Sequence, residues 1–263
     1  MALSLSKLLR TLQSEFRYLK GMKDSAYYHY RKLRSKPHED DFLALRFIPD
    51  DLPGSYVDVG ANHGQSIESI KAIKSGARVF SFEANGMLAA RLIERYRGRE
   101  DITVFAFGLA DEEQQRTLYV PSYKGFVYDG IASFDRASAA DWLSPHTLYW
   151  FSPKKLVLHE TSCTTRRLDE QNLQPVLIKI DVQGYEYQVI KGGIETIKRH
   201  EPILLIEDFH WEREMGVLLA GLGYEQYLFD ENGFYARRDD TVINKFLMTP
   251  RRAATVKIST QPK

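Results

Sequence analysis

Two patterns of apolar residues alternate in the first half of the chain, and together they predict strands separated by helices. Short apolar runs lie at 56–59, 77–82 and 102–107. Between these runs, apolar residues recur at helical spacing over 67–73 and about 86–97. Short strands that alternate with amphipathic helices are typical of an α/β fold with a mostly parallel sheet.

The second half of the chain repeats this order and then ends differently. Val176–Val182 and Pro202–Ile206 are near-continuous apolar runs, which is typical of buried parallel strands. A helix is expected at about 211–221. Tyr224–Phe229 and Phe234–Arg237 then flank a short turn that contains a glycine, so we expect an antiparallel C-terminal hairpin. The whole pattern predicts a doubly wound, mostly parallel sheet.

Residues 117–170 break this rhythm, and we expect them to form a substrate-recognition insertion. Strand-like pieces at 117–120, 155–159 and 163–167 enclose a loop-rich middle. The aromatic residues of this region are Tyr119, Tyr123, Phe126, Tyr128, Phe134, Trp142, Tyr149, Trp150 and Phe151. Such rings either line a site for a sugar or another ring-bearing acceptor, or they pack the insertion onto the sheet. We expect each interpretation to hold for some of the rings.

The N-terminal segment has the pattern of a basic helical arm. Apolar residues form one helical stripe over 3–20, with basic residues elsewhere, and a second helical stretch is expected at roughly 24–36. One interpretation is an arm that contacts an anionic membrane surface or a partner enzyme. The other is a pair of helices that pack on the core or on a second copy of the chain, in a homo-oligomer. We divide the chain into this arm at 1–45, a main domain at 46–240 and a basic tail at 241–263.

Charge is distributed unevenly along the 263 residues. The net charge is +1, but residues 1–36 carry +7, residues 241–263 carry +5 and the middle of the chain carries −11. A broad nucleic-acid groove needs a basic surface. We therefore do not expect the acidic middle of the chain to bind nucleic acid.

Cysteine count and hydropathy bear on the location of the protein. Cys163 is the single cysteine, so the chain has no intrachain disulfide, which fits a reducing compartment. No apolar run approaches the roughly 20 residues that span a bilayer. The start, MALSLSKLLR, lacks the apolar core of a signal peptide. We expect a cytoplasmic protein, and the Arg-, Leu- and Ser-rich start leaves an organelle transit peptide as the alternative.

Candidate chemistry is concentrated at the end of the first predicted strand. Asp58 lies in that strand, and Gly60 and Gly64 bracket the turn into the next helix. Glycines there let the backbone turn sharply and let a ligand approach closely. Glu83 ends the second strand, where an acid can accept hydrogen bonds from both hydroxyls of a ribose. The Gly-x-x-x-Gly spacing favours a nucleoside without a pyrophosphate, and an ordinary strand–helix turn is the alternative.

Several motifs, in this order along about 56–210, resemble the FkbM family of S-adenosylmethionine-dependent methyltransferases. They are VDVGANHG at 57–64, FE at 82–83, FGLA at 107–110, RLD at 167–169, IKIDVQGYE at 178–186 and the strand at 202–207. Two positions depart from the family pattern. Ala84 stands where the family usually has a proline, which changes the rigidity of that turn. Gln183 stands where the family usually has a glutamate, so one carboxylate is missing.

The resemblance implies a class I, Rossmann-like methyltransferase domain with a seven-stranded sheet, whose antiparallel strand comes from the C-terminal hairpin. It implies S-adenosyl-L-methionine as the cofactor. The cofactor-binding residues that it implies are Asp58, Gly60, Ala61, Asn62, Gly64, Glu83, Ala84, Phe107, Gly108 and Asp181. The turn around Asn62 would shape the methionine side of the pocket, with Asp58 orienting the turn. Glu83 would hold the ribose, and Phe107 and Gly108 would lie beside the adenine.

Methyl transfer to an alcohol needs a base, because the hydroxyl proton must leave. Asp181 and His210 follow adjacent predicted strands and are the catalytic candidates. The alternatives are a loop-capping role for Asp181 and a structural hydrogen bond for His210. A further alternative is that Asp181, Glu207 and Asp208 hold Mg²⁺ against the substrate oxygen. Lys179 is expected to pair with Asp181 or Glu207.

Three functions are open on the sequence alone. The first is an O-methyltransferase for a hydroxyl of a sugar, a glycan or a secondary metabolite. The second is a methyltransferase for a protein or nucleic-acid nitrogen, although the chain lacks a Pro-Pro-aromatic amine-binding motif. The third is a non-catalytic cofactor-binding scaffold that docks through its basic helices. The presence of both Glu83 and Asp181 argues against the third function.

Overall fold

The computed structural model of the chain describes residues 5–15, 37–207 and 209–259. The helix expected at 24–36 lies outside the described residues. A helix long and apolar enough to cross a membrane is not found in the part of the chain that the structure describes.

The chain folds into two compact units, whose limits differ from the expected domain limits. The larger unit contains residues 35–114 and 164–263, and the smaller unit contains residues 115–163 together with the described N-terminal helix. That helix therefore belongs with the aromatic-rich insertion and is not a separate arm. The insertion ends at Cys163 rather than at residue 170.

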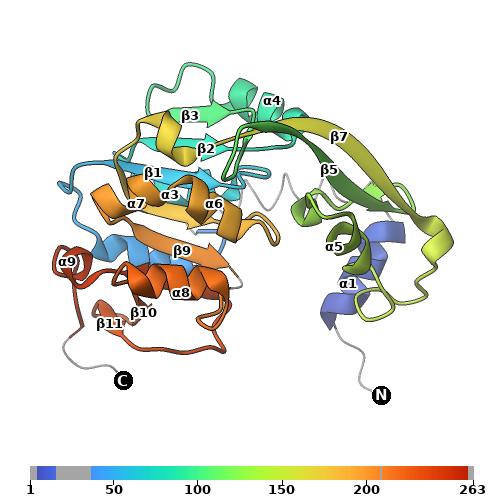
Figure 1. Cartoon of the computed structure of the whole chain (residues 1–263). Coiled ribbons are helices and arrows are strands. Elements are labelled where there is room, and N and C mark those ends of the chain that lie inside the picture. The colour runs from blue at the N-terminus through green and yellow to red at the C-terminus, as the bar shows by residue number, and fades with distance from the viewer. Residues whose placement is uncertain (1–4, 16–36, 208, 260–263) are drawn as a thin grey trace. The chain divides into compact units, whose positions relative to one another are not determined.

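The larger unit is built on one sheet of eight strands among the described residues (Figure 1). These strands are β1 (Ser55–Val59), β2 (Val79–Phe82), β3 (Ile102–Phe105), β8 (Pro175–Ile180), β9 (Ile203–Glu207), β10 (Glu225–Phe229), β11 (Phe234–Ala236) and β12 (Asn244–Met248). Their order across the sheet is β11-β10-β12-β9-β8-β1-β2-β3, and the neighbours from β9 to β3 are parallel. The chain order reverses between β1 and β8, so the carboxyl ends of these two strands are the expected ligand-binding position.

The two central strands β1 and β8 are buried along their whole length, as their apolar sequences predict. Successive side chains of a strand point to opposite faces of the sheet. Tyr56 and Leu177 therefore pack in one apolar cluster, whereas Val57 and Ile178 pack in another. A sheet with an apolar cluster on each face must be covered on both sides.

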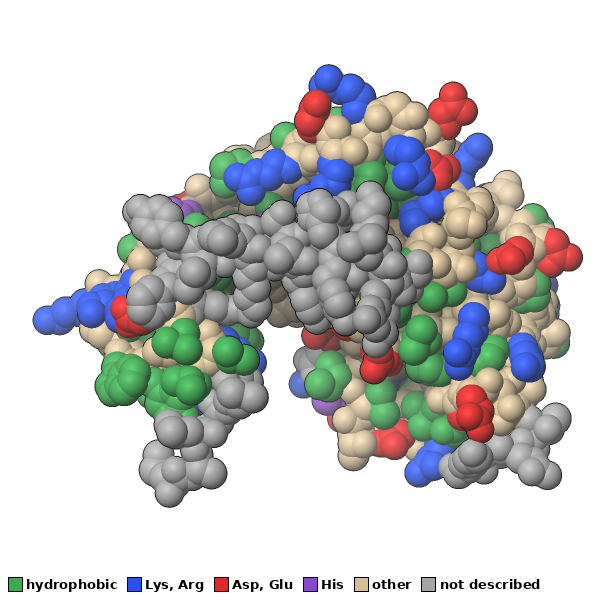
Figure 2. Space-filling view, turned by 180° about the vertical axis from the view of Figure 1, so that it is seen from behind, with side chains coloured by type: hydrophobic (Ala, Val, Ile, Leu, Met, Phe, Trp, Pro, Cys, Tyr) green, Lys and Arg blue, Asp and Glu red, His purple; other side chains and the backbone are tan. Residues whose placement is uncertain are grey.

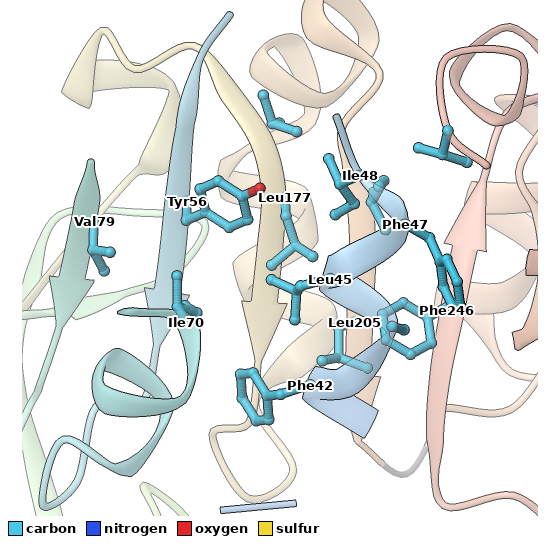
Figure 3. Packing of buried hydrophobic residues seen from close by; sticks show 14 of the residues in the cluster. Phe42, Leu45, Phe47, Ile48, Tyr56, Ile70, Val79, Leu177, Leu205 and Phe246 are labelled. Atoms are coloured by element: carbon cyan, nitrogen blue, oxygen red, sulfur yellow. The ribbon is translucent and has the colours of Figure 1, made fainter. Parts of the chain in front are cut away.

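Helices cover both faces of this sheet. They are α3 (Gln65–Ile73), α4 (Gly86–Arg95), α6 (Glu186–Gly192), α7 (Ile194–His200), α8 (Glu214–Gly221) and α9 (Pro250–Ala253), with the 3₁₀ segments η1 (Asp40–Phe47) and η4 (Leu168–Gln171). Residues of η1, α3 and α4 belong to the cluster of Tyr56, and residues of α6, α7 and α8 belong to the cluster of Val57. Figure 3 shows Leu45 of η1 beside Leu177, and Phe42 of η1 belongs to the same cluster.

The C-terminal strands correct two expectations. The expected hairpin is present as β10 and β11, which pair antiparallel with Phe229 opposite Phe234. The antiparallel strand beside β9 is nevertheless β12, which lies between β9 and β10. The sheet therefore has eight strands among the described residues instead of seven. Residues 244–248, expected in a basic tail, form a strand because Phe246 and Met248 are buried in the core.

The smaller unit combines the N-terminal helix with most of two long strands, β5 and β7, and the segment between them. Its elements are α1 (Leu5–Glu15), most of β5 (Gln114–Tyr123), β6 (Phe126–Val127), η2 (Asp129–Ile131), α5 (Arg136–Asp141), η3 (Pro153–Lys155) and most of β7 (Leu156–Arg166). Thr11 of α1 accepts a hydrogen bond from the Tyr149 backbone N–H at 2.9 Å. The Lys7 ammonium lies 4.5 Å from the centroid of the Tyr149 ring. Helix α1 thus packs on the insertion through polar and cation–π contacts.

Several of the nine aromatic rings serve the packing of this smaller unit. Tyr123 and Phe151 stack with their ring centroids 5.3 Å apart, and Tyr123 is fully buried. Trp150, in contrast, is 81% exposed, and Leu9 and Leu12 of α1 are nearly half exposed. Figure 2 shows hydrophobic side chains gathered on the visible face of this unit.

The RLD motif at 167–169 has a structural role in the larger unit. The Asp169 carboxylate accepts hydrogen bonds from the backbone N–H groups of Thr196 and Glu195 at 2.8 and 3.3 Å. These N–H groups lie in the first turn of α7, where they have no partner within the helix. Asp169 therefore fixes the start of α7, which explains why residues 164–170 belong to the larger unit.

Candidate active site

The turn after β1 contains a glycine that no other residue can replace without moving the backbone. Gly60 has a φ of 87°, and a Cβ atom placed on it would lie 1.9 Å from the backbone oxygen of Asp181. The Asp181 N–H donates to the Val59 carbonyl at 3.1 Å. The predicted cofactor turn and the predicted base therefore lie side by side at the carboxyl ends of β1 and β8.

The rest of this turn also has a left-handed backbone. Asn62 has a φ of 48° and Gly64 has a φ of 84°. Glycine and asparagine tolerate this conformation better than other residues. Ala61, between Gly60 and Asn62, is buried, and Gly64 leads directly into α3. The predicted turn residues Gly60, Ala61, Asn62 and Gly64 thus form one tight corner.

Glu83 follows β2, and its carboxylate is fixed from two sides by backbone N–H groups. The Asn62 N–H donates to Oε2 at 2.6 Å, and the Asn85 N–H donates to Oε1 at 2.8 Å. Burial raises the pKa of Glu83 above its usual value, although the two N–H groups oppose this shift. Ala84 spans the gap to Asn85, whose side chain caps α4. Each carboxylate oxygen keeps a lone pair with which it can accept a further hydrogen bond.

Asp58 lies within β1, directly opposite Lys179 of β8, and both side chains are buried. The Ser81 hydroxyl donates to Asp58 Oδ2 at 2.7 Å, and the Lys179 ammonium lies 3.9 Å from Oδ1. Burial raises the pKa of Asp58, and the positive charge of Lys179 opposes the shift. Asp58 therefore joins three neighbouring strands beneath the turn.

Two buried oxygens in this corner test whether the residues fit S-adenosylmethionine. Asp58 Oδ1 and Asn62 Oδ1 have no hydrogen-bond partner within the described residues. A buried oxygen without a partner costs free energy unless a ligand or water satisfies it. The cofactor carries an ammonium group and two ribose hydroxyls, and these groups can donate hydrogen bonds to the two buried oxygens and to the Glu83 carboxylate. The residues present therefore fit this cofactor.

Phe107 lies near the end of β2, beside other aromatic rings. Its ring centroid is 5.5 Å from that of Phe82 and 5.4 Å from that of Phe105. The guanidinium carbon of Arg166 lies 4.7 Å from the Phe107 centroid. Gly108 is buried and opens the short strand β4 (Gly108–Leu109), which pairs with β7. The structure thus brings Phe107 close to the end of β2, which Glu83 follows, and its place beside the adenine stays a prediction.

Asp181 is held by two nitrogen donors. The Lys179 ammonium donates to Oδ2 at 3.0 Å, and the Gln183 amide donates to Oδ1 at 3.0 Å. The same amide nitrogen lies 3.3 Å from Glu207 Oε2 at the end of β9. Burial alone would raise the pKa of Asp181, but the Lys179 charge and these hydrogen bonds lower it to about 2. The hydrogen bond with Asp181, together with burial, raises the pKa of Glu207 to about 8.

His210 lies beside the Glu212 carboxylate, just before α8. Its Nδ1 lies 3.6 Å from Glu212 Oε1, and its side chain is about one-third exposed. Its backbone oxygen accepts a hydrogen bond from the Arg213 N–H before α8 begins. The role of His210 as a base stays a prediction.

The candidate Mg²⁺ site finds no support in the donor set. Within residues 5–15, 37–207 and 209–259, no group of three His, Cys, Asp or Glu side chains is arranged to hold a metal ion. Asp208 lies outside the described residues. Asp181 and Glu207 share the Gln183 amide instead, and the Lys179 ammonium already balances part of their charge.

Sequence reasoning missed how several polar residues connect the site. Lys179 was expected to pair with Asp181 or Glu207, and it pairs with Asp181 and Asp58. Its position within an apolar strand was the available signal, because a buried charge needs a partner. The sequence shows Gln183 only as the loss of a carboxylate, and no sequence pattern indicates that its side chain contacts two carboxyls.

The fold and the corner between β1 and β2 define an α/β protein with a candidate nucleoside-binding turn. The Methyltransferase FkbM domain matches residues 58–234, and the chain belongs to this family. The match begins at Asp58 and includes Glu83 and Asp181.

Similar proteins were found among curated sequences and solved structures. The 2-O-methyltransferase NoeI of Sinorhizobium fredii (strain NBRC 101917 / NGR234) is 27% identical over 148 residues, which cover 54% of this chain and 58% of NoeI. The chain thus matches little more than half of that relative. Methyltransferase FkbM from Methylobacillus flagellatus KT is 18% identical, with a TM-score of 0.43, over 74% of this chain and 43% of that one. Precorrin-6y C5,15-methyltransferase from Geobacter metallireducens GS-15 is 12% identical, with a TM-score of 0.34, over 83% and 85%.

Proposed function

We propose that the chain is an S-adenosylmethionine-dependent O-methyltransferase that acts on a hydroxyl of a sugar, a glycan or a secondary metabolite. Membership of the FkbM family supports methyl transfer, and the similarity to a 2-O-methyltransferase supports an oxygen acceptor. The observation that carries the proposal is the Glu83 carboxylate, which the Asn62 and Asn85 N–H groups hold at the end of β2. The sheet order supports a class I, Rossmann-like assignment.

Each residue of the corner has a part in holding the cofactor. When bound, S-adenosylmethionine supplies a methyl group on a positively charged sulfur. Glu83 accepts hydrogen bonds from the ribose hydroxyls, and Asp58 and Asn62 offer buried oxygens to the ammonium group. Gly60 and Gly64 give the turn its shape, because a Cβ atom would meet the Asp181 backbone oxygen at 1.9 Å on Gly60 and the Leu92 side chain at 2.9 Å on Gly64. Phe107 offers an apolar ring to the adenine.

Asp181 is the residue that links the cofactor turn to the acceptor. It lies beside Gly60, and its lowered pKa keeps it ionised at neutral pH. An ionised carboxylate there accepts the hydroxyl hydrogen of the acceptor and aligns its oxygen for in-line transfer. Proton removal by a positioned carboxylate then makes the alcohol a better nucleophile.

Calorimetric titration of S-adenosylhomocysteine tests the cofactor part of the proposal. We expect wild-type protein to bind with a dissociation constant in the micromolar range, which corresponds to a binding free energy on the order of −8 kcal/mol. Glu83→Ala should lose this binding, because the ribose hydroxyls lose their acceptor. Glu100→Ala is the matched control, since Glu100 is exposed on the loop before β3. Absence of binding to folded wild-type protein would reject the cofactor assignment.

A transfer assay tests the acceptor part. Labelled S-adenosylmethionine is incubated with a panel of methyl glycosides of neutral sugars, and label in the sugar fraction is measured. Methyl ethers on one hydroxyl position are the expected product. Cofactor binding without transfer to any alcohol would favour the non-catalytic scaffold, and label on protein or nucleic acid would favour a nitrogen acceptor.

A further inference from the structure

Gln183 occupies an unusual position between two carboxyls of the candidate site. It has a φ of 53°, although it is not a glycine, and it is the third residue after the end of β8. Its side-chain nitrogen lies 3.0 Å from Asp181 Oδ1 and 3.3 Å from Glu207 Oε2. A left-handed backbone at a residue of this kind is strained and persists only where the surrounding structure imposes it.

The surrounding turn fixes that strained backbone from the other side. Glu186 Oε1 accepts hydrogen bonds from the Val182 N–H at 3.3 Å and from the Gly184 N–H at 3.1 Å. These two N–H groups flank Gln183, and Gly184 is itself left-handed with a φ of 91°. The turn therefore directs the Gln183 side chain back across the ends of β8 and β9.

We propose that Gln183 is a positioning residue that holds the Asp181 and Glu207 carboxyls together, so that the pair receives the proton of the acceptor hydroxyl. This inference rests on the proposed O-methyltransferase function. An amide NH₂ has two hydrogens, and one can be donated to each carboxyl. A glutamate at this position would place a third carboxyl against the pair. The side-chain nitrogen of glutamine instead supplies two hydrogen-bond donors.

The two carboxyls have different partners, and this difference gives them different roles. Asp181 has a nitrogen donor on each oxygen, so it is the anchored anion of the pair. Glu207 has the Gln183 amide as its one nitrogen donor within the described residues, and its pKa is raised by the hydrogen bond with Asp181 and by burial. Two carboxyls in contact share a proton, because both cannot ionise without repulsion.

Other charged groups face this pair from three neighbouring elements. Lys179 of β8 lowers the pKa of both carboxyls. Glu39, which precedes η1, acts in the opposite direction on Glu207. Asn244 of β12 pairs in register with Glu207, and its amide donates to Glu39 and to Asp41. Among the described residues, Lys179 is the cation that acts on both carboxyls, and the acids nearby oppose it. The second proton of the pair therefore leaves only at a raised pH.

The transfer step balances with the pair as proton acceptor. The acceptor oxygen bonds to the methyl carbon as the carbon–sulfur bond breaks, and the electrons of that bond leave on sulfur. The hydroxyl proton moves to Glu207 in the fraction of molecules in which both carboxyls are ionised, and this fraction grows as pH rises to about 8. Solvent takes this proton after the product leaves.

A carboxyl titration on the protein itself tests the role of Gln183 without an acceptor. Protein with ¹³C at the glutamate side-chain carboxyls is titrated by NMR, and the signal absent from Glu207→Gln identifies Glu207. In Gln183→Leu, the Glu207 signal should titrate at a pH about one unit higher than in wild type, because the ionised form loses a donor. Gln174→Leu, at an exposed position, should leave the signal unchanged. Gln183→Gly repeats the test with a residue suited to the left-handed backbone, in case the leucine variant does not fold.

Cofactor binding and turnover separate positioning from a purely structural role. Gln183→Gly should bind S-adenosylhomocysteine within about twofold of wild type, because the glycine turn after β1 is intact. On a methyl glycoside that wild type methylates, kcat should fall roughly 10- to 100-fold with little change in KM. A Glu207 signal with the same titration in wild type and both Gln183 variants would overturn the inference and leave the proposed function standing. Failure of wild type to bind S-adenosylhomocysteine would instead reject the proposed function.

Discussion

The backbone N–H of Asn62 and the carboxylate of Glu83 form a 2.6 Å hydrogen bond that joins the turn after β1 to the end of β2. This bond uses one lone pair of the group that is proposed to hold the ribose. Glu83 therefore has two tasks, since it shapes the turn and it accepts hydrogen bonds from the ligand. A substitution that preserves the size of the side chain affects both tasks, and ligand affinity and protein stability measure the two effects separately.

Glu83→Gln should bind S-adenosylhomocysteine at least about tenfold more weakly than wild type, because a hydrogen bond to a charged acceptor contributes about 1.5–3 kcal/mol. The amide places an NH₂ group against the Asn62 or the Asn85 N–H, so one donor of the corner also loses its acceptor. Calorimetry measures the affinity, and thermal unfolding of the free protein reports the cost to the turn. Equal affinity of Glu83→Gln and wild type would show that the ribose does not use this carboxylate.

Gly60→Ala should destabilise the protein more than Gly98→Ala does. Both glycines have a left-handed backbone, with φ values of 87° and 79°. A Cβ on Gly60 would meet the Asp181 backbone oxygen at 1.9 Å, whereas nothing lies within 4 Å of a Cβ on Gly98. Gly98→Ala measures the cost of a left-handed backbone alone, which is about 1–2 kcal/mol. The additional loss of stability in Gly60→Ala measures the clash with the Asp181 backbone. Urea unfolding of both variants gives the comparison, and equal losses would show that β1 and β8 can separate at this point.

Lys179→Met should destabilise the protein by about 3–5 kcal/mol at pH 8, because it leaves the Asp58 and Asp181 carboxylates buried without their cation. The pKa values of both acids should rise in the folded variant. A raised folded-state pKa stabilises the folded protein at low pH, and this contribution is lost as pH rises. The loss in Lys179→Met should therefore be smaller at pH 5 than at pH 8.

Lys191→Met is the matched control for this prediction. Lys191 pairs with Asp111 at 2.7 Å, but its side chain is nearly half exposed. Exposed ion pairs contribute about 0–1 kcal/mol, so its loss should be small at both pH values. Urea unfolding at the two pH values measures both variants. A pH-independent loss in Lys179→Met would mean that Asp58 and Asp181 do not depend on this ammonium.

The contrast between Glu83 and Gln183 shows which site residues can be predicted from the sequence and which cannot. Glu83 ends a recognisable strand after a recognisable glycine turn, so local patterns suffice to place it near the cofactor corner. Gln183 acts across two strands through its side chain, and its contact with Glu207 depends on the sheet order and on a strained φ. No periodicity encodes either of these features.

The missed strand β12 has a similar cause. Its apolar core, Phe246–Met248, is three residues long and lies in a basic segment, so the charge pattern indicated a tail. The partners that bury it are distant in sequence, with Phe246 opposite Leu205 of β9 and Tyr227 of β10. Short strands of this kind are specified by tertiary packing more than by local propensity. The parallel half of the sheet was predictable because each of its strands is apolar throughout or nearly so.

Glu207 should make the stability of the protein fall as pH rises, and Glu207→Gln should remove this contribution. The pKa of Glu207 rises from its usual 4.5 to about 8, owing to the hydrogen bond with Asp181 and to burial. The folded protein therefore binds this proton more tightly than the unfolded chain does. The resulting stabilisation is complete below about pH 4.5 and is lost progressively as pH rises to about 8.

Urea unfolding of wild type and Glu207→Gln at pH 5, 6.5, 8 and 9 tests this expectation. Distant groups titrate alike in the two proteins, so their effect cancels in the difference in unfolding free energy. The change of this difference with pH therefore reports the ionisation of Glu207 and of Asp181, which is coupled to it. We expect the variant to gain stability relative to wild type between pH 5 and 8 and to change little from pH 8 to 9. A difference that is constant with pH would mean that Glu207 ionises normally, and the carboxyl pair would then hold no proton at neutral pH.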